Sequence, residues 1–171
     1  MVLRGPQGGG QQLTAQHSQC VEAWYVHTPG LYVVAAATPA DAKGLLKTAI
    51  RDDNPIIFLE HLGLYNMKAE VPDDPEFTVP LGKASTRRAG TDVTIFTYSK
   101  TLYPALEAAE QLEQEEISVE VIDLRSLRPI DLEAIVESVH RTHRAVIVTE
   151  AWQPCGMSRE IAGLIYQHAF D

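Results

Sequence analysis

The sequence has few of the features that mark secreted or membrane proteins. Its 171 residues include only two cysteines, Cys20 and Cys155, which form no CxxC pair. We expect two buried, reduced thiols rather than a disulfide or a metal pair. No apolar run approaches the roughly 20 residues that span a bilayer, and the N-terminus lacks the charged-then-apolar pattern of a signal peptide. These absences predict a soluble cytoplasmic protein with no membrane partner.

Positive charge is also scarce. The chain has 14 Lys and Arg against 23 Asp and Glu, and its formal net charge is -9. Arg87 and Arg88 are the only adjacent basic pair, so we expect no nucleic-acid partner. The nucleophile pattern G-x-S-x-G is missing too. The run GGGQQL has Leu13 where a dinucleotide-binding loop needs a third glycine, and no Lys-Ser/Thr follows it, so it is a weak signal for a nucleotide-binding module.

What the chain does contain is an alternation of apolar runs and helical segments. The continuous apolar runs are typical of buried strands. Thr38 is a good N-cap, with Pro39 at the first helical position behind it. This alternation predicts an α/β fold with mainly parallel sheets and helices on both faces. The predicted strands are 31–37, 55–61, 93–99, 119–124 and 144–151, with a truncated one at MVLR, and the predicted helices are 38–51, 102–115, 131–142 and 155–170.

Residues 63–92 interrupt the alternation with three prolines and several acidic residues. This stretch reads as a linker between two units, residues 1–80 and residues 81–171. An open parallel sheet of so few strands would leave an edge without a neighbour, so we interpret the chain as a fragment or as a subunit that another chain completes.

Candidate chemistry begins with His17, which follows the glycine run. Hydrogen-bonding neighbours surround it in AQHSQ, and we expect them to fix its tautomer. His61 lies at a strand end, where α/β proteins often place functional groups, although the placement is not specific. His140 and His143 lack a third metal ligand and suit a helix C-terminus. The helix stop in AIRDDNP (49–55) leaves carbonyls without helical partners, which can bind a cation.

Three long blocks carry a family resemblance: RGPQGGGQQLTAQHSQ, PGLYVVAAATPADAKGLLKTAIRDDNPIIFLEH and EVIDLRSLRPIDLEAI. In this order they resemble the beta subunit of the thiamine diphosphate-dependent 2-oxo acid dehydrogenases. EHLGLYN and RTHRAVIVTEA resemble the plastid and cyanobacterial, pyruvate-oxidising type. The resemblance implies the second half of a pyrimidine-binding domain in residues 1–80, followed by a truncated transketolase C-terminal-like domain in residues 81–171.

The implied activity is oxidative decarboxylation of pyruvate with acyl transfer to lipoyl groups. The implied cofactor is thiamine diphosphate, with Mg²⁺ held mainly by an alpha subunit, and the implied partners are that alpha subunit (alpha2 beta2) and a lipoyl acyltransferase. His17 matches the family's substrate-channel histidine. A structural K⁺ is implied at backbone carbonyls of Met1, Ala49, Ile50, Asp52 and Asn54.

The family's glutamate that activates the cofactor has no counterpart in this chain, so we expect the isolated chain to be inactive. We also expect it to be poorly soluble alone. Branched-chain 2-oxo acids and acetoin remain alternative substrates, because the family's beta subunits share these blocks. A truncated paralogue that binds without catalysis remains the alternative from another class.

Overall fold

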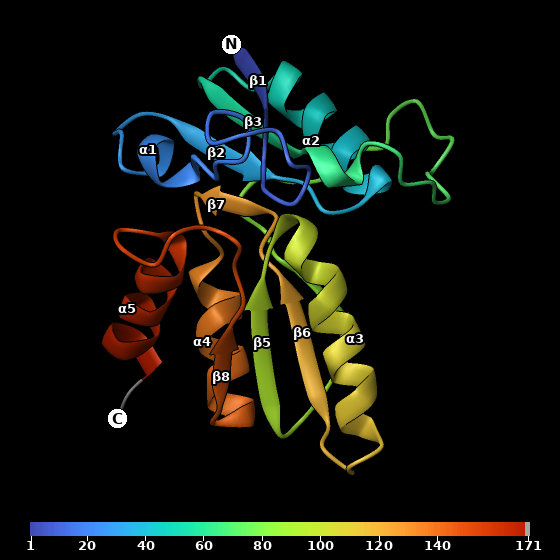
Figure 1. Cartoon of the computed structure of the whole chain (residues 1–171), viewed down its shortest axis with the longest axis vertical. Helices are drawn as coiled ribbons and strands as arrows, with labels where there is room; N and C mark the ends of the chain where they lie inside the picture. Colours follow the sequence, from blue (N-terminus) through green and yellow to red (C-terminus); the bar gives the residue numbers. More distant parts are fainter. Residues whose placement is uncertain (170–171) are drawn as a thin grey trace.

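The computed structural model describes residues 1–169 and shows two stacked α/β units (Figure 1). Sheet A has three parallel strands that begin with Val2, Tyr32 and Ile56, and one short antiparallel strand on its far edge. Val33 and Ile57 are register partners at its centre. In spatial order its strands are β1 (Val2–Gln7), β3 (Ile56–His61), β2 (Tyr32–Ala35) and β7 (Ser126–Arg128).

Sheet B lies in the second unit. Its central pair is parallel, with Ile95 opposite Val121, and a second parallel partner joins at Val146. An antiparallel strand forms the other edge. In spatial order its strands are β4 (Ser85–Arg88), β6 (Val119–Asp123), β5 (Val93–Thr97) and β8 (Ala145–Ile147). The prediction of mainly parallel sheets is therefore confirmed.

The helices begin where the sequence supplies caps. The Thr38 hydroxyl accepts the Asp41 N–H at 3.1 Å, and the Asp131 carboxylate accepts the Ala134 N–H at 3.3 Å. Both bonds satisfy N–H groups that a helix start leaves without partners. The helices are α1 (Glu22–Val26), α2 (Pro39–Arg51), α3 (Leu102–Glu113), α4 (Leu132–Thr142) and α5 (Met157–Ala169), with 3₁₀ turns η1 (Leu62–Leu64) and η2 (Ser99–Thr101). No helix within residues 1–169 is long and apolar enough to cross a membrane.

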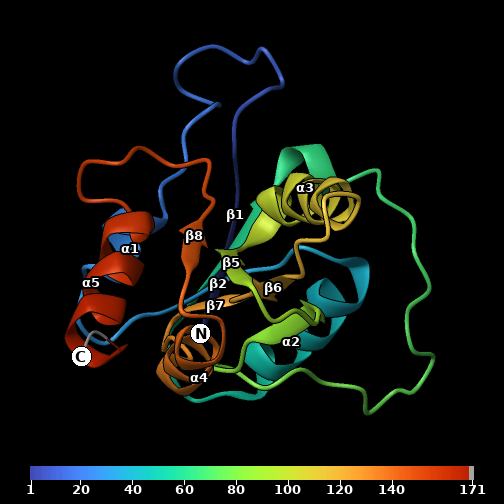
Figure 2. The same ribbon diagram turned by 90° about the horizontal axis from the view of Figure 1, so that it is seen from below.

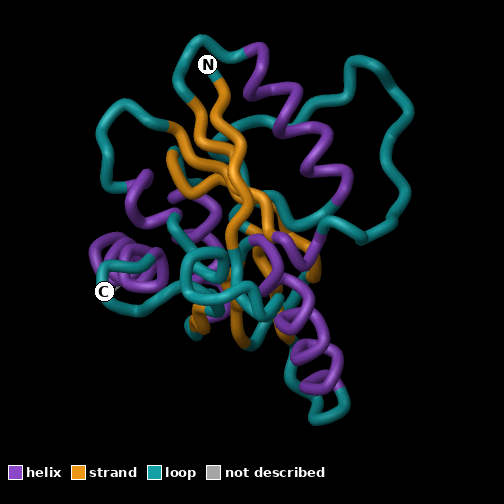
Figure 3. The backbone as a smooth tube through the Cα atoms, turned by 45° about the horizontal axis from the view of Figure 1, so that its top comes forward, coloured by secondary structure: helices purple, strands orange, loops and turns teal. Residues whose placement is uncertain are grey.

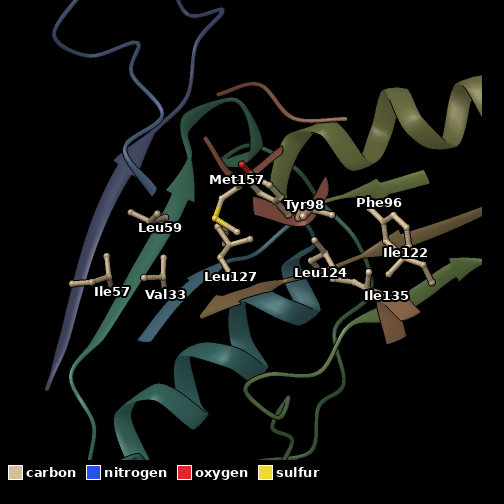
Figure 4. Close-up of a cluster of buried hydrophobic side chains, with 12 residues drawn as sticks. Val33, Ile57, Leu59, Phe96, Tyr98, Ile122, Leu124, Leu127, Ile135 and Met157 are labelled. Carbon is tan, nitrogen blue, oxygen red and sulfur yellow. The ribbon is translucent and has the colours of Figure 1, made fainter. Parts of the chain in front are cut away.

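Three apolar clusters hold these layers together. One lies between sheet A and α2, and another between sheet B and α3. The third cluster spans both units: Val33 and Leu59 of sheet A share it with Phe96 and Ile122 of sheet B and with Ile135 of α4. Figure 4 shows Leu127 of β7 between these two groups of side chains. The units therefore share one core.

Several details differ from the sequence-based expectations. The stretch 63–92 is not all linker, because β4 lies within it, and β7 was not predicted. Both cysteines are free, as expected, but neither is fully buried, because Cys20 is partly buried and Cys155 is exposed. The Trp24 side chain is exposed to solvent. The expected helix from 155 begins at Met157, and its predicted end at residue 170 lies outside the described residues.

The remaining part of the connection between the units is a long excursion beside α2 (Figure 3). Lys43 donates to the carbonyl of Pro72, and Lys47 donates to that of Pro75. Arg51 pairs with Glu76. The three cations recur every four residues, so they share one face of the helix and tie the excursion to it.

Candidate active site

The glycine-rich segment and His17 belong to one closed loop, residues 8–19. The Gly8 N–H donates to the Gln19 carbonyl at 2.9 Å, which brings the two ends of the loop together. Gly8 and Gly10 have φ of +100° and +80°, a conformation that glycine adopts without steric cost. The His17 side chain is exposed. The loop therefore holds its histidine toward the outside of the fold.

Residues of the second unit that follow β8 form hydrogen bonds with this loop. Glu150 Oε1 accepts the Gly9 N–H at 3.0 Å, and Trp152 Nε1 donates to Gln19 Oε1 at 3.4 Å. Figure 2 shows the blue loop after β1 beside the orange-red segment that follows β8. The loop of the first unit is therefore positioned by residues of the second.

Glu150 also binds His61, which ends β3. Their Nε2 and Oε2 atoms lie 2.6 Å apart, and the imidazole is 2% exposed. Because Nδ1 accepts the Gly63 N–H at 3.0 Å, the hydrogen-bond network assigns the ring proton to Nε2, which donates to Glu150. The glycine run packs directly on this pair, since a Cβ on Gly8 would lie 2.1 Å from Nε2.

Further acidic and hydroxyl groups lie behind the pair. Tyr98 donates to Glu22 Oε1 at 2.5 Å. Burial, with the nearby Glu22 carboxylate, raises the pKa of Tyr98 well above its usual value, so the phenol stays protonated. Burial followed by the charges of Glu22 and Glu150 raises the pKa of the Cys20 thiol to about 12. Cys20 is therefore a neutral thiol and a poor nucleophile.

A pocket of about 310 Å³ opens at the carboxyl ends of β2 and β3, on the other side of His61. Its walls are mostly apolar, with Phe58 and Met67 among them. The cation in its wall, Arg4, is already paired with Glu60, with Nε 2.7 Å from Oε1. Tyr65 donates to the same carboxylate at 2.9 Å. The pocket therefore suits an apolar group better than a diphosphate.

The flanks of His17 act differently from what we expected. Gln16 Oε1 accepts a hydrogen bond from Thr14 at 2.8 Å, and Gln19 Nε2 donates to the Ala15 carbonyl at 2.8 Å. These amides therefore bind the loop itself rather than the imidazole. His140 lies in the last turn of α4, and His143 caps it with φ of +56°, as the helix-end interpretation expects.

Three of the five residues predicted to bind K⁺, Met1, Asp52 and Asn54, are linked by hydrogen bonds at one corner of sheet A, and the other two, Ala49 and Ile50, lie in the last turn of α2. The Met1 carbonyl accepts the Ile56 N–H at 2.8 Å, and the Met1 ammonium donates to the Asn54 carbonyl at 3.4 Å. The Asn54 N–H donates to Asp52 Oδ1 at 2.8 Å. It therefore does not form the helical hydrogen bond to the Ile50 carbonyl. A donor set made only of backbone carbonyl oxygens is of the kind that hard cations prefer.

Glu150 and Glu22 were not predicted as functional residues from the sequence. Glu150 lies near the end of the predicted strand 144–151, and that position was a usable signal. Glu22 carried no such signal. Its partner Tyr98 is 76 residues away, and nothing in the local sequence connects the two. The described residues hold no cluster of three or more His, Cys, Asp or Glu side chains that could bind a metal.

Two family models match the chain. The pyrimidine-binding domain of transketolase matches residues 1–68, and the C-terminal domain of transketolase matches residues 82–171. Among solved structures, a split-gene transketolase described as an inactive beta4 tetramer has a TM-score of 0.80 and 27% sequence identity. That match covers 97% of this chain and 53% of the other.

Curated relatives match over the whole chain. The mitochondrial pyruvate dehydrogenase E1 component subunit beta of Dictyostelium discoideum is 51% identical, and the match covers 100% of this chain and 49% of that protein. The corresponding subunit of Mesostigma viride is 48% identical, with 100% and 52% covered. The chain spans about half the length of these relatives. It belongs to the transketolase-type family, as part of a pyrimidine-binding domain joined to a transketolase C-terminal domain, and it is homologous to pyruvate dehydrogenase E1 beta subunits.

Proposed function

We propose that this chain is part of the beta subunit of the decarboxylating component of a pyruvate dehydrogenase complex. The observation that carries the proposal is the 51% and 48% identity, over its whole length, to two relatives with that name. On this proposal the chain works with an alpha subunit and passes an acyl group to the lipoyl arm of an acyltransferase. The domain boundary near residue 80 is part of the same proposal.

His17 is the proposed catalytic residue. Its exposed position on loop 8–19 supports this role, because an imidazole at the molecular surface can reach a substrate held by a neighbouring subunit. Imidazole gives and takes protons at neutral pH, which suits proton transfer during acyl transfer. Thiamine diphosphate, when bound, supplies the electron sink for the loss of carbon dioxide. This chain's part is to hold the proton donor in place.

The chain alone should be inactive. Arg4 is occupied by Glu60, so the 310 Å³ pocket offers no free cation of its own for a diphosphate. An alpha subunit would supply the diphosphate and Mg²⁺ site. The activating glutamate would come from beta-subunit sequence outside this chain. Decarboxylation of pyruvate by the purified chain with thiamine diphosphate and Mg²⁺ would contradict this part of the proposal.

A structural K⁺ at the Met1–Asn54 corner is a further part of the proposal. We expect a higher melting temperature in KCl than in choline chloride of equal ionic strength, because a cation that binds only the folded chain stabilises it. LiCl serves as the control for ionic strength with a smaller ion. Equal melting temperatures in the three salts would argue against the ion site.

The test of function uses a chimera. Residues 1–171 replace the matching segment in the full-length beta subunit of Mesostigma viride, which is then co-expressed with that organism's alpha subunit. We expect turnover of pyruvate with kcat/KM about tenfold or more above that for a branched-chain 2-oxo acid or acetoin. His17→Gln should lower lipoyl acylation by about 10²- to 10⁴-fold, whereas His27→Gln, at an exposed histidine elsewhere, should not.

Other outcomes would identify the alternatives. A preference for branched-chain 2-oxo acids or acetoin would reassign the substrate. A chimera that assembles with the alpha subunit but turns over none of these substrates, while the unaltered Mesostigma viride protein is active, would favour a binding paralogue without catalysis.

A further inference from the structure

The anchoring of loop 8–19 by the second unit has a functional consequence. We propose that Glu150, through its paired contacts with Gly9 and His61, is a positioning residue that fixes the loop and so sets the place of His17. The proposal deepens the proposed function and rests on it for the part that concerns catalysis. The anchoring itself is a property of the chain and is testable without any substrate.

The geometry of Glu150 carries the first step. Its two carboxylate oxygens serve different partners: Oε1 accepts the Gly9 N–H at 3.0 Å, and Oε2 accepts from His61 Nε2 at 2.6 Å. The side chain is 29% exposed, whereas the imidazole is 2% exposed. Hydrogen bonds to an ionised acceptor in a partly dry site are stronger than neutral ones. Glu150 therefore links the loop to a buried, fixed ring.

The second step is the rigidity of His61. Its ring is held from both sides, because Nδ1 accepts the Gly63 N–H at 3.0 Å and Nε2 donates to Glu150. Gly8 lies against the ring face so closely that no side chain fits between them. The first residues of the loop are thus clamped between β3 and Glu150, and a shift of Glu150 would release them.

The third step leads from the clamp to His17. The Gly8 N–H to Gln19 carbonyl bond closes the loop, so the clamp at Gly8 and Gly9 reaches His17 through Gln19, which lies two residues from it. Trp152 adds a second contact at Gln19, from the same segment as Glu150. Misplacing a catalytic group by about 1 Å can cost around 10²-fold in rate, so anchoring of this loop should affect catalysis as well as stability.

Hydrogen exchange tests the anchoring directly. In the purified full chain, Glu150→Ala should speed exchange in peptides covering residues 8–19 by about tenfold or more, because local opening loses its main restraint. A peptide over β6 (Val119–Asp123) should keep its rate. Glu137→Ala, at an exposed carboxylate on α4, is the matched control and should change neither peptide.

A conservative variant and a double variant sharpen this test. Glu150→Gln replaces one of the two acceptor oxygens with an NH₂ group that can only donate, so one of the two bonds is lost. Its loop should therefore exchange at a rate between those of the parent and Glu150→Ala. His61→Ala combined with Glu150→Ala should open the loop no further than Glu150→Ala alone, because the two residues act as one clamp. An unchanged loop in Glu150→Ala, or equal acceleration over the whole chain, would overturn the proposal.

Catalysis is measured separately in the chimera with its alpha subunit. Glu150→Gln should lower kcat for lipoyl acylation by about 10- to 100-fold and leave KM for pyruvate within about twofold, the pattern of a group that acts in the transition state. Equal acylation rates in Glu150→Gln and the parent would remove the link to His17. An inactive parent chimera would instead contradict the proposed function and leave the exchange result valid.

Discussion

At the scale of single residues, Gly8 shows how tightly the site is built. Its φ of +100° is a conformation that residues with a side chain rarely adopt, and a Cβ would lie 2.1 Å from the His61 ring. We expect Gly8→Ala to lower the free energy of unfolding by about 1–3 kcal/mol or more, from backbone strain and the clash together. Denaturant unfolding measures this change.

Gly5→Ala is the matched control, because nothing lies within 4 Å of its Cβ position and its φ is not in the positive range. This substitution should change stability by less than about 1 kcal/mol, and alanine can even gain from the lower entropy of the unfolded chain. Equal losses in the two variants would show that the contact between Gly8 and His61 is not tight in solution.

At the scale of elements, Asp131 joins a helix to a strand. Its carboxylate caps α4 through the Ala134 N–H, and its Oδ2 accepts the Ala84 N–H just before β4, at 2.9 Å. Asp131→Ala should cost about 2–4 kcal/mol, more than an ordinary cap, because two partly buried N–H donors lose their acceptor. Glu133→Ala, on the exposed face of the same turn, should cost under about 1 kcal/mol in the same unfolding experiment. Comparable losses would contradict the cap.

The elements also show what sequence can and cannot reveal. The helix beginning at Pro39 was predictable because Thr38 and Pro39 are local signals. The strand β7 was not, because its three residues pair with β2 about 90 positions away and carry no period of their own. Glu150 had a local signal, its position near the end of a predicted strand, but its contacts with Gly9 and His61 could not be predicted, since these partners lie far away in sequence. Local patterns therefore located the elements, whereas the contacts between the units depend on the folded chain.

At the scale of the whole molecule, charged groups cross between the units. Arg87 of β4 pairs with Asp41 of α2 and with Asp123 at the end of β6, the latter at 2.9 Å. Arg125 pairs with the other oxygen of Asp41 at 3.1 Å. All four side chains are mostly buried. The two arginines thus connect the first unit to the second through oppositely charged carboxylates.

This network predicts a pH dependence of stability. Burial raises the pKa of Asp123 to about 6, despite the opposing effect of Arg87. Between its usual pKa of 3.8 and about 6, the folded chain holds more protons than the unfolded chain, so this group's contribution to stability falls as pH rises. The loss should be on the order of 2–3 kcal/mol. It should be complete above about pH 7.

Asp123→Asn isolates this contribution because asparagine does not titrate. The free energies of unfolding of the parent and the variant are measured with denaturant from pH 4 to pH 7.5. As pH rises, the free energy of unfolding of the parent should fall relative to that of the variant. Groups that do not interact with Asp123 titrate equally in both proteins and cancel. A difference that stays constant with pH would show that Asp123 titrates at the same pH in the folded and unfolded chains.

The shared core predicts that the two units unfold together. Leu127 is 2% exposed and lies in the cluster that joins both sheets. Leu127→Ala should cost about 2–5 kcal/mol and lower one common transition, seen at the same denaturant concentration by fluorescence and circular dichroism. Separate transitions, with only one shifted by the substitution, would mean that the units are independent.

The position of β7 in sheet A has a consequence for biosynthesis. The ribosome releases β1, β2 and β3 first, yet the outer edge of β2 stays uncovered until residues 126–128 have emerged. At about 5–20 residues per second, that interval lasts on the order of several seconds. During this time the outer edge of β2 has no paired strand, and an open edge of this kind favours pairing with other chains. We therefore expect a chaperone that shields nascent chains to raise the soluble yield most when translation is slow between residues 62 and 128.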